Sequence, residues 1–199
     1  MSATATAPGK LDSSPLAALL PRLELAGGAA AALDGCTLVS EALSRLAGAG
    51  FLVEAARLCA HALPHREAVW WALQCAAHTA PADLPEADRT ARDLAEQWVR
   101  RRSDEIRRAA MQKAELAGYG TPEAWAAVAA FWSGDSMSPP DAPKVPPPPH
   151  LPGTAVTGCV VLASVRTQPQ RQADRLRRFL DSARDLAAGG AGRLAPESA

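Results

Sequence analysis

The chain has 199 residues, of which 48% are hydrophobic, and its 21 Lys and Arg residues balance its 21 Asp and Glu residues. This length fits one domain with tails, and a zero net charge is unlike the basic excess of nucleic-acid-binding proteins. No apolar run reaches the ~18 residues that span a bilayer, and residues 1–10 lack the apolar segment of a secretory signal. We therefore expect no nucleic-acid partner and no membrane insertion.

The four cysteines occur in apolar, helix-like stretches rather than in paired motifs. They are Cys36, Cys59, Cys75 and Cys159. Disulfide frameworks are typical of small secreted chains, and this sequence has no other mark of secretion. Because free cysteine is often a core residue, we expect reduced, buried thiols and a cytoplasmic protein.

The first half of the chain predicts a flexible start followed by short stacked helices. Residues 1–14 are small and polar and are expected to be flexible. We expect a helical domain over residues 15–187, with its core in residues 37–187. Three short amphipathic helices are predicted between 37 and 78, because apolar residues recur at helical spacing and Gly or Pro ends each run. The short turns between them favour antiparallel stacking.

A longer helix is predicted from Asp83, which with Glu86 has the spacing of a capping box, to Gly118. Its apolar face is interrupted at residues 100–102, three consecutive arginines, so we expect a bend or a solvated middle there. A basic run can hold phosphate. Acidic residues flank this one, however, and favour a solvated, charge-paired face.

The stretch 121–132 predicts the central helix of the core. Thr-Pro-Glu at its start is a typical helix beginning. Trp125 and Trp132 then lie seven residues apart on one apolar face, with Phe131 beside them, and Gly134 ends the helix.

A proline-rich strap follows over residues 138–152, and Pro146–Pro149 favour polyproline II. Two interpretations remain open. The favoured one packs the strap against Trp125, Trp132 or Trp71 of its own chain, because the aromatic helix and the strap are consecutive. In the other, the strap stays free and binds an aromatic-lined groove of another protein.

The last third of the chain predicts two more helices. Residues 154–166 have helical apolar spacing, and helix is favoured over strand because nothing else offers a strand partner. Pro169 opens a final amphipathic helix, and residues 188–199 are expected to form a flexible C-terminal tail. The predicted fold class is therefore all-α, a single compact multi-helix domain of stacked antiparallel helices with a proline-rich strap.

Possible zinc ligands occur within twenty residues of each other. They are Cys59, His61, His65, Cys75 and His78. No tight Cys-x-x-Cys pair is present and Pro64 interrupts the set, so core cysteines and surface or capping histidines are the favoured interpretation. The sequence also has no glycine-rich phosphate loop, no GxSxG elbow and no paired carboxylates on an apolar face. We expect no catalytic residue, no metal and no cofactor, which disfavours an enzyme.

Four segments carry a resemblance to a known family. They are residues 63–71 (LPHREAVWW), 121–125 (TPEAW), 131–134 (FWSG) and 146–151 (PPPPHL). Over roughly residues 37–180 the chain resembles a bacterial family of small helical proteins known as a domain of unknown function. Some similar proteins are linked with type VI secretion loci. The resemblance implies an adaptor or accessory role and assigns no catalytic residue.

The leading hypothesis is a cytoplasmic, non-enzymatic helical interaction module that binds another protein. The candidate interaction surface comprises Trp70, Trp71, Trp125, Trp132, Pro147, Pro148 and His150. The alternative is a small-molecule- or metal-binding protein, or an enzyme, with a pocket near Trp70, Trp71, Trp125 and His150. A closed apolar pocket with convergent polar groups favours the alternative, and an open apolar groove favours the interaction module.

Overall fold

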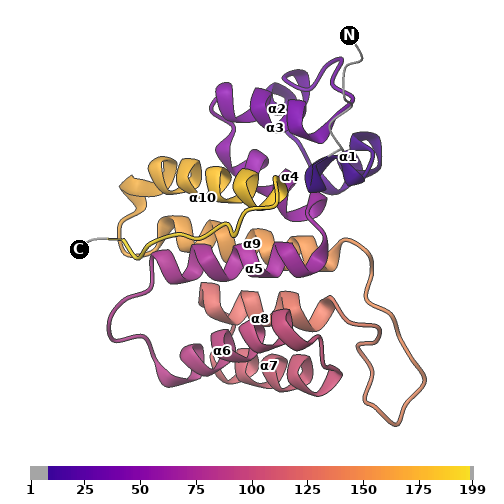
Figure 1. The fold of residues 1–199 in the computed structure, drawn as a ribbon, viewed down its shortest axis with the longest axis vertical. Helices are drawn as coiled ribbons and strands as arrows, with labels where there is room; N and C mark the ends of the chain where they lie inside the picture. The colour runs from indigo at the N-terminus through magenta and orange to yellow at the C-terminus, as the bar shows by residue number, and fades with distance from the viewer. Residues whose placement is uncertain (1–8, 198–199) are drawn as a thin grey trace.

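The computed structural model describes residues 9–197, which contain ten α-helices, two short 3-10 helices and no strand (Figure 1). The predicted all-α fold class is confirmed. The α-helices are α1 (Leu16–Leu23), α2 (Gly27–Ala31), α3 (Val39–Gly48), α4 (Leu52–Ala62), α5 (His65–His78), α6 (Glu86–Arg101), α7 (Asp104–Leu116), α8 (Pro122–Trp132), α9 (Leu151–Val165) and α10 (Gln172–Ala187). The 3-10 helices are η1 (Lys10–Ser13) and η2 (Pro169–Arg171).

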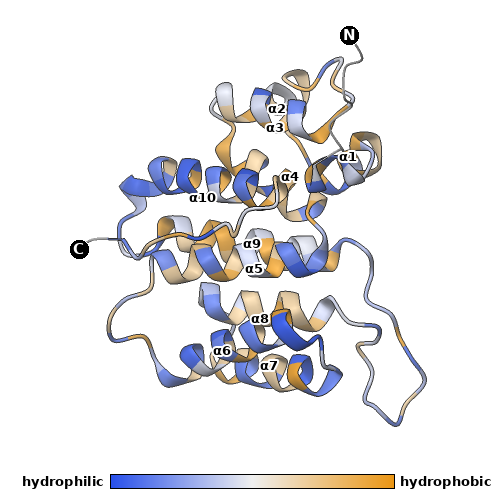
Figure 2. Cartoon of the chain, viewed as in Figure 1, coloured by the Kyte–Doolittle hydropathy of each residue, from blue (hydrophilic) through white to orange (hydrophobic). Residues whose placement is uncertain are grey.

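The helices stack in layers, as Figure 1 shows. Helices α1 to α4 lie at one end, α5, α9 and α10 cross the middle, and α6, α7 and α8 lie at the other end. Helices α8 and α9 pack against each other, and α8 also contacts α5, α6 and α7. Hydropathy follows this arrangement, because α8 and α9 are mostly apolar while α6 and α10 carry many hydrophilic residues (Figure 2).

Helix α8 lies in the core, as its apolar face predicts. Thr121 caps it, with its hydroxyl oxygen accepting a hydrogen bond from Ala124 N at 3.3 Å. All residues from Ala126 to Phe131 are buried, and the alanines among them let neighbouring helices approach closely. Trp125 and Trp132 are half-buried and form an edge-to-face pair with ring centroids 6.5 Å apart.

The predicted long helix is interrupted at the arginine run and folds as two helices. Arg102 takes a left-handed conformation with φ of 52°, and Ser103 then caps α7 by accepting from Ile106 N at 3.4 Å. Because α6 and α7 pack against each other, the chain reverses its direction at this interruption rather than bending slightly. The predicted capping role of Asp83 is wrong, since α6 begins at Glu86 after Pro85 and no side chain caps it.

The N-terminal segment is more ordered than its composition predicts. Leu11 is buried, Asp12 Oδ1 accepts from Ser40 N at 2.9 Å, and Lys10 pairs with Glu67 at 3.0 Å. The expected flexibility is therefore wrong for residues 9–14, while residues 1–8 lie outside the described residues. The core also begins before residue 37, because α1 contributes buried leucines. These are Leu16, Leu19 and Leu23.

The C-terminal segment, residues 188–197, packs along α5 and α10 instead of forming the predicted loose tail. Ser182 Oγ donates to Gly192 O at 2.6 Å, and Gly192 N donates to Asp185 Oδ2 at 2.8 Å. Trp70 Nε1 donates to Ala191 O at 2.8 Å. These bonds hold the segment against the two helices, so the expectation of a flexible tail is corrected up to residue 197. Residues 198–199 lie outside the described residues.

Candidate functional site

A cavity of about 720 Å³ lies where α1, α4, α8 and α9 meet. Its lining combines charged, polar and apolar side chains. The lining residues are Pro21, Arg22, Glu24, Val53, Arg57, His61, Trp125, His150, Leu151, Thr154, Thr157, Gly158 and Val161. A volume of this size falls within the ~300–1,000 Å³ typical of small-molecule sites.

Two helices supply most of the cavity wall because each turns one face toward it. On α4, Val53, Arg57 and His61 are spaced four residues apart and share a face. On α9, Gly153 lies directly under the His61 ring, since a Cβ there would come within 2.3 Å of Nδ1. Gly158 likewise lies under the Trp125 ring, at 3.2 Å from a would-be Cβ. The two glycines therefore let both rings lie close to the α9 backbone.

The cavity is cationic at neutral pH. Arg22 and Arg57 contribute two guanidinium groups, against the single carboxylate of Glu24. Burial, and then the neighbouring charges of Arg22, Arg57 and His150, lower the pKa of His61 from 6.5 to about 4. His61 is therefore a neutral imidazole at pH 7, able to donate or accept a hydrogen bond at this wall.

The cavity brings together only part of the predicted pocket. Trp125 and His150 line it, but Trp70 and Trp71 do not. Trp71 is fully buried and donates from Nε1 to Phe179 O at 2.8 Å, and half-buried Trp70 bonds to the C-terminal segment. The predicted pocket near Trp70 and Trp71 is therefore corrected to one near His61, Trp125 and His150.

The proline-rich strap projects from the molecule as a long loop between α8 and α9, drawn in orange in Figure 1. Pro146, Pro148 and Pro149 are exposed and Pro147 is half-buried. The favoured prediction that the strap packs on its own tryptophans is therefore wrong for most of Pro146–Pro149. Trp125 packs instead on α9 and donates from Nε1 to Tyr119 O at 2.9 Å.

The base of the strap is fixed by hydrogen bonds although its prolines are exposed. Met137 N donates to Val145 O at 2.7 Å, and Val145 N donates to the buried Ser136 Oγ at 3.0 Å. Ser138 Oγ donates to Pro143 O at 2.6 Å. Buried Arg107 of α7 donates to Ser136 O at 2.8 Å and ties this base to the helical body.

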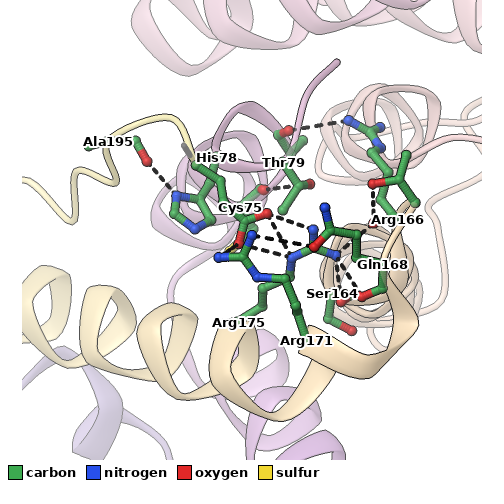
Figure 3. Close-up of polar contacts among 12 residues, drawn as sticks. Cys75, His78, Thr79, Ser164, Arg166, Gln168, Arg171, Arg175 and Ala195 are labelled. Carbon is green, nitrogen blue, oxygen red and sulfur yellow. Dashed lines mark hydrogen bonds and ion pairs between the residues drawn. The ribbon is translucent and has the colours of Figure 1, made fainter. Parts of the chain in front are cut away.

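A buried polar network joins α5, α9, α10 and the C-terminal segment (Figure 3). Arg175 is 2% exposed, and its Nη2 pairs with Glu197 Oε2 at 2.6 Å. Arg175 Nη1 also donates to Ser164 O and Arg166 O, at 3.1 and 2.7 Å. Hydrogen bonds from Arg175, opposed by burial, hold the pKa of the Glu197 carboxyl below its usual value.

His78 ties the same network to α5. Its Nδ1 bonds to Ala195 O, and Glu197 N donates to His78 O at 2.7 Å. The His78 ring also packs edge-to-face on Phe179, with centroids 5.8 Å apart. Because Arg175, Glu197 and His78 Nδ1 all bind groups of the same chain, the arrangement fixes the C-terminal segment against α5 and α10.

A second buried charge joins α8 to α9. Glu123 is fully buried, and both its carboxylate oxygens accept from Arg166, one of them from Nη1 at 3.0 Å. Arg166 Nη1 is also 3.4 Å from Ala76 O on α5. The pair therefore connects three helices at their buried ends.

The possible zinc ligands do not form one cluster. His61 lines the cavity, His65 is exposed at the start of α5, and His78 bonds to Ala195. Over residues 9–197, no three His, Cys, Asp or Glu side chains converge to hold a metal ion. Burial raises the pKa of Cys59 to about 12 and also raises that of Cys75, so both are protonated thiols at neutral pH. Cys36 is only half-buried, contrary to the expected burial of all four cysteines.

A family model matches residues 42–187. The chain belongs to DUF6931, a family of unknown function. No curated protein and no solved structure matches the chain. In the part of this DUF6931 protein that the structure describes, no helix has both the length and the apolar character to cross a membrane.

The DUF6931 match covers only part of the cavity and only part of the buried network around Arg175. Arg22 and Glu24 of the cavity lie before residue 42, and Glu197 of the buried network lies after residue 187. The remaining cavity walls, from α4, α8 and α9, lie inside the matched region.

The charged residues that organise this DUF6931 protein have weak signals in the sequence. Glu123 is recognisable in the sequence only as part of the Thr-Pro-Glu helix beginning, although a carboxylate inside one of the two most apolar helices is itself a signal of a buried partner. The favoured interpretation makes His61 a surface or capping histidine, although its spacing from Val53 and Arg57 places all three on one face. Glu197 carries no local signal, because its partner Arg175 lies on a separate element.

Proposed function

We propose that this DUF6931 protein is a non-enzymatic helical interaction module, an adaptor or accessory protein that binds another protein. The strap carries the proposal: Val145, Pro146, Pro148 and Pro149 are exposed on a loop whose base is fixed by Ser136. An exposed polyproline segment suits an aromatic-lined groove on a partner, because a stiff chain loses little entropy on binding.

The setting of this function is part of the same proposal. A bacterial origin and a link with type VI secretion loci rest on the resemblance of the sequence motifs, and a cytoplasmic location rests on the four cysteines, which occur outside paired motifs. A protein partner, rather than a nucleic acid, is supported by the balance of 21 basic and 21 acidic residues.

The strap is tested by replacing Pro146–Pro149 with alternating glycine and serine, which keeps the loop length but removes its rings and stiffness. We expect the melting temperature to stay within about 2 °C of the wild type, because most of these rings are exposed. A partner captured from a host lysate by the wild type should be lost by this variant. A synthetic peptide copying residues 143–151 should compete with the wild type for that partner.

The matched control replaces Pro139 and Pro140, which are exposed on the same loop, with glycine and serine. This variant should keep the partner. Retention of the partner by the Pro146–Pro149 variant would show that these prolines do not bind it. A large fall in the melting temperature would show that they stabilise the fold, and either result would remove the support for this function.

A small-molecule-binding protein is the second candidate function. The observation that favours it is the cavity of about 720 Å³, which polar residues of α1, α4 and α9 line together with Trp125. Saturable binding of a low-molecular-weight probe at this cavity would support it.

A further inference from the structure

We propose that the cavity between α1, α4, α8 and α9 binds a small organic anion, a negatively charged group carried on a flat apolar body. This inference rests on the second candidate function and specifies the chemistry of its ligand. It is independent of the prolines Pro146–Pro149, which do not line the cavity.

The cationic side of the cavity would hold the charged group. Arg22 and Arg57 both line the cavity, and neither takes part in an ion pair among residues 9–197. Arg57 is oriented by its bond from Nη1 to Leu23 O at 2.5 Å. Guanidinium groups hold carboxylates, phosphates and sulfonates through paired hydrogen bonds, so two of them at one wall favour an anion.

The start of α9 adds to the positive potential at the same wall. His150, Leu151 and Thr154 all line the cavity, so the N-terminal turn of this 15-residue helix faces it. The His150 side chain does not cap the helix. The helix dipole therefore favours negative charge at this end of the cavity.

The apolar side of the cavity would hold the body of the ligand. The Trp125 ring lies over Gly158, and Leu151 and Val161 extend the surface along α9. An indole ring presents a flat face on which an aromatic or planar group can stack. Charge at one wall and a flat apolar surface at another together select an amphiphilic anion over a bare ion.

The probe is anilinonaphthalene sulfonate, an aromatic anion whose fluorescence rises in apolar surroundings. Its matched control is N-phenylnaphthylamine, which has the same aromatic body without the sulfonate. We expect the full-length protein to bind the sulfonate at one saturable site and at least about tenfold more tightly than the neutral probe, since charged hydrogen bonds contribute this much.

Two pairs of variants locate the binding. Thr154 is exposed at the cavity wall, so Thr154→Glu adds a negative charge there and Thr154→Gln is the neutral match. A glutamate in the first turn of α9 favours the helix, so Thr154→Glu should fold normally. We expect Thr154→Glu to weaken sulfonate binding about tenfold and Thr154→Gln to leave it nearly unchanged.

Arg22→Gln removes one cation from the cavity, and Arg101→Gln removes an exposed cation at the end of α6. We expect only Arg22→Gln to weaken sulfonate binding, by about fivefold. Equal losses from the two arginine variants, or from the two Thr154 variants, would overturn the anion site. Equal affinity for the neutral probe would also overturn it but leave a small-molecule site, whereas no binding of either probe would overturn both.

Discussion

Gly134, at the end of α8, lies against the guanidinium group of Arg107. A Cβ on Gly134 would come within 2.2 Å of Arg107 Nε. Arg107 cannot easily move aside, because it donates to Phe131 O at 3.1 Å and its Cζ lies 5.1 Å from the centre of the Phe131 ring. Position 134 therefore has room only for glycine. The missing side chain lets Arg107 pass close to the backbone and reach Ser136 at the base of the strap.

We expect Gly134→Ala to lower the free energy of unfolding by about 1–3 kcal/mol, the usual cost of overfilling a packed site. The matched control is Gly48→Ala at the end of α3, where an added Cβ meets nothing within 4 Å. This control should be neutral or stabilising by up to about 1 kcal/mol. Urea denaturation of the three proteins measures the difference, and equal stability of the two variants would contradict the role of Arg107.

Between elements, the Glu123–Arg166 pair decides how α8 and α9 fit together. The Glu123 side chain is fully buried and that of Arg166 is 11% exposed. Two charges removed from water must compensate each other, so removing one leaves the other buried and unpaired. The pair therefore specifies which ends of the two helices lie together.

We expect Glu123→Met to destabilise the protein by about 3–5 kcal/mol, because the Arg166 charge would remain buried without its carboxylate partner. Arg166→Met should have a comparable effect through Glu123. The double variant should lose much less than the sum of the two, since no buried charge remains. Chemical denaturation in a double-mutant cycle gives the coupling energy, and additive losses would show that the pair is not coupled.

The helices were predictable because apolar spacing is a local property. The periodic apolar residues of α8 and α9 indicate helices whatever the rest of the chain does. The cavity was not predictable in full, because Arg22 and Trp125 meet there although they lie on separate elements. The docking of residues 9–14 and 188–197 was not predictable for the same reason, since small and polar residues give no local sign of a distant partner.

At the scale of the whole molecule, the docked C-terminal segment makes stability depend on pH. The pKa of Glu197 is lowered chiefly by its hydrogen bonds from Arg175, with Arg171 and His78 adding to the effect. A carboxyl group with a lowered pKa in the folded state contributes stability at pH values above its unfolded pKa. That contribution is lost as the pH falls through the lower pKa of the folded state.

We therefore expect Glu197→Gln to lower the free energy of unfolding at pH 7 by about 1–3 kcal/mol. The difference between this variant and the wild type should begin to shrink near the ordinary pKa of 4.5 and disappear at still lower pH. Denaturation curves across this range measure it. Glu105→Gln, at an exposed position in the first turn of α7, is the control. A constant difference at all pH values would assign the loss to packing rather than to charge.

The packing of α1 and of residues 188–197 also determines how this protein can usefully be truncated. A fragment cut to residues 42–187 would keep the whole stretch that defines the family. It would nevertheless lose the carboxylate that neutralises buried Arg175 and the leucines with which α1 covers α4. The region shared with relatives and the unit that folds are thus different lengths of chain. Expression vectors, crystallisation trials and domain fusions should include the whole unit that folds, not only the region shared with relatives.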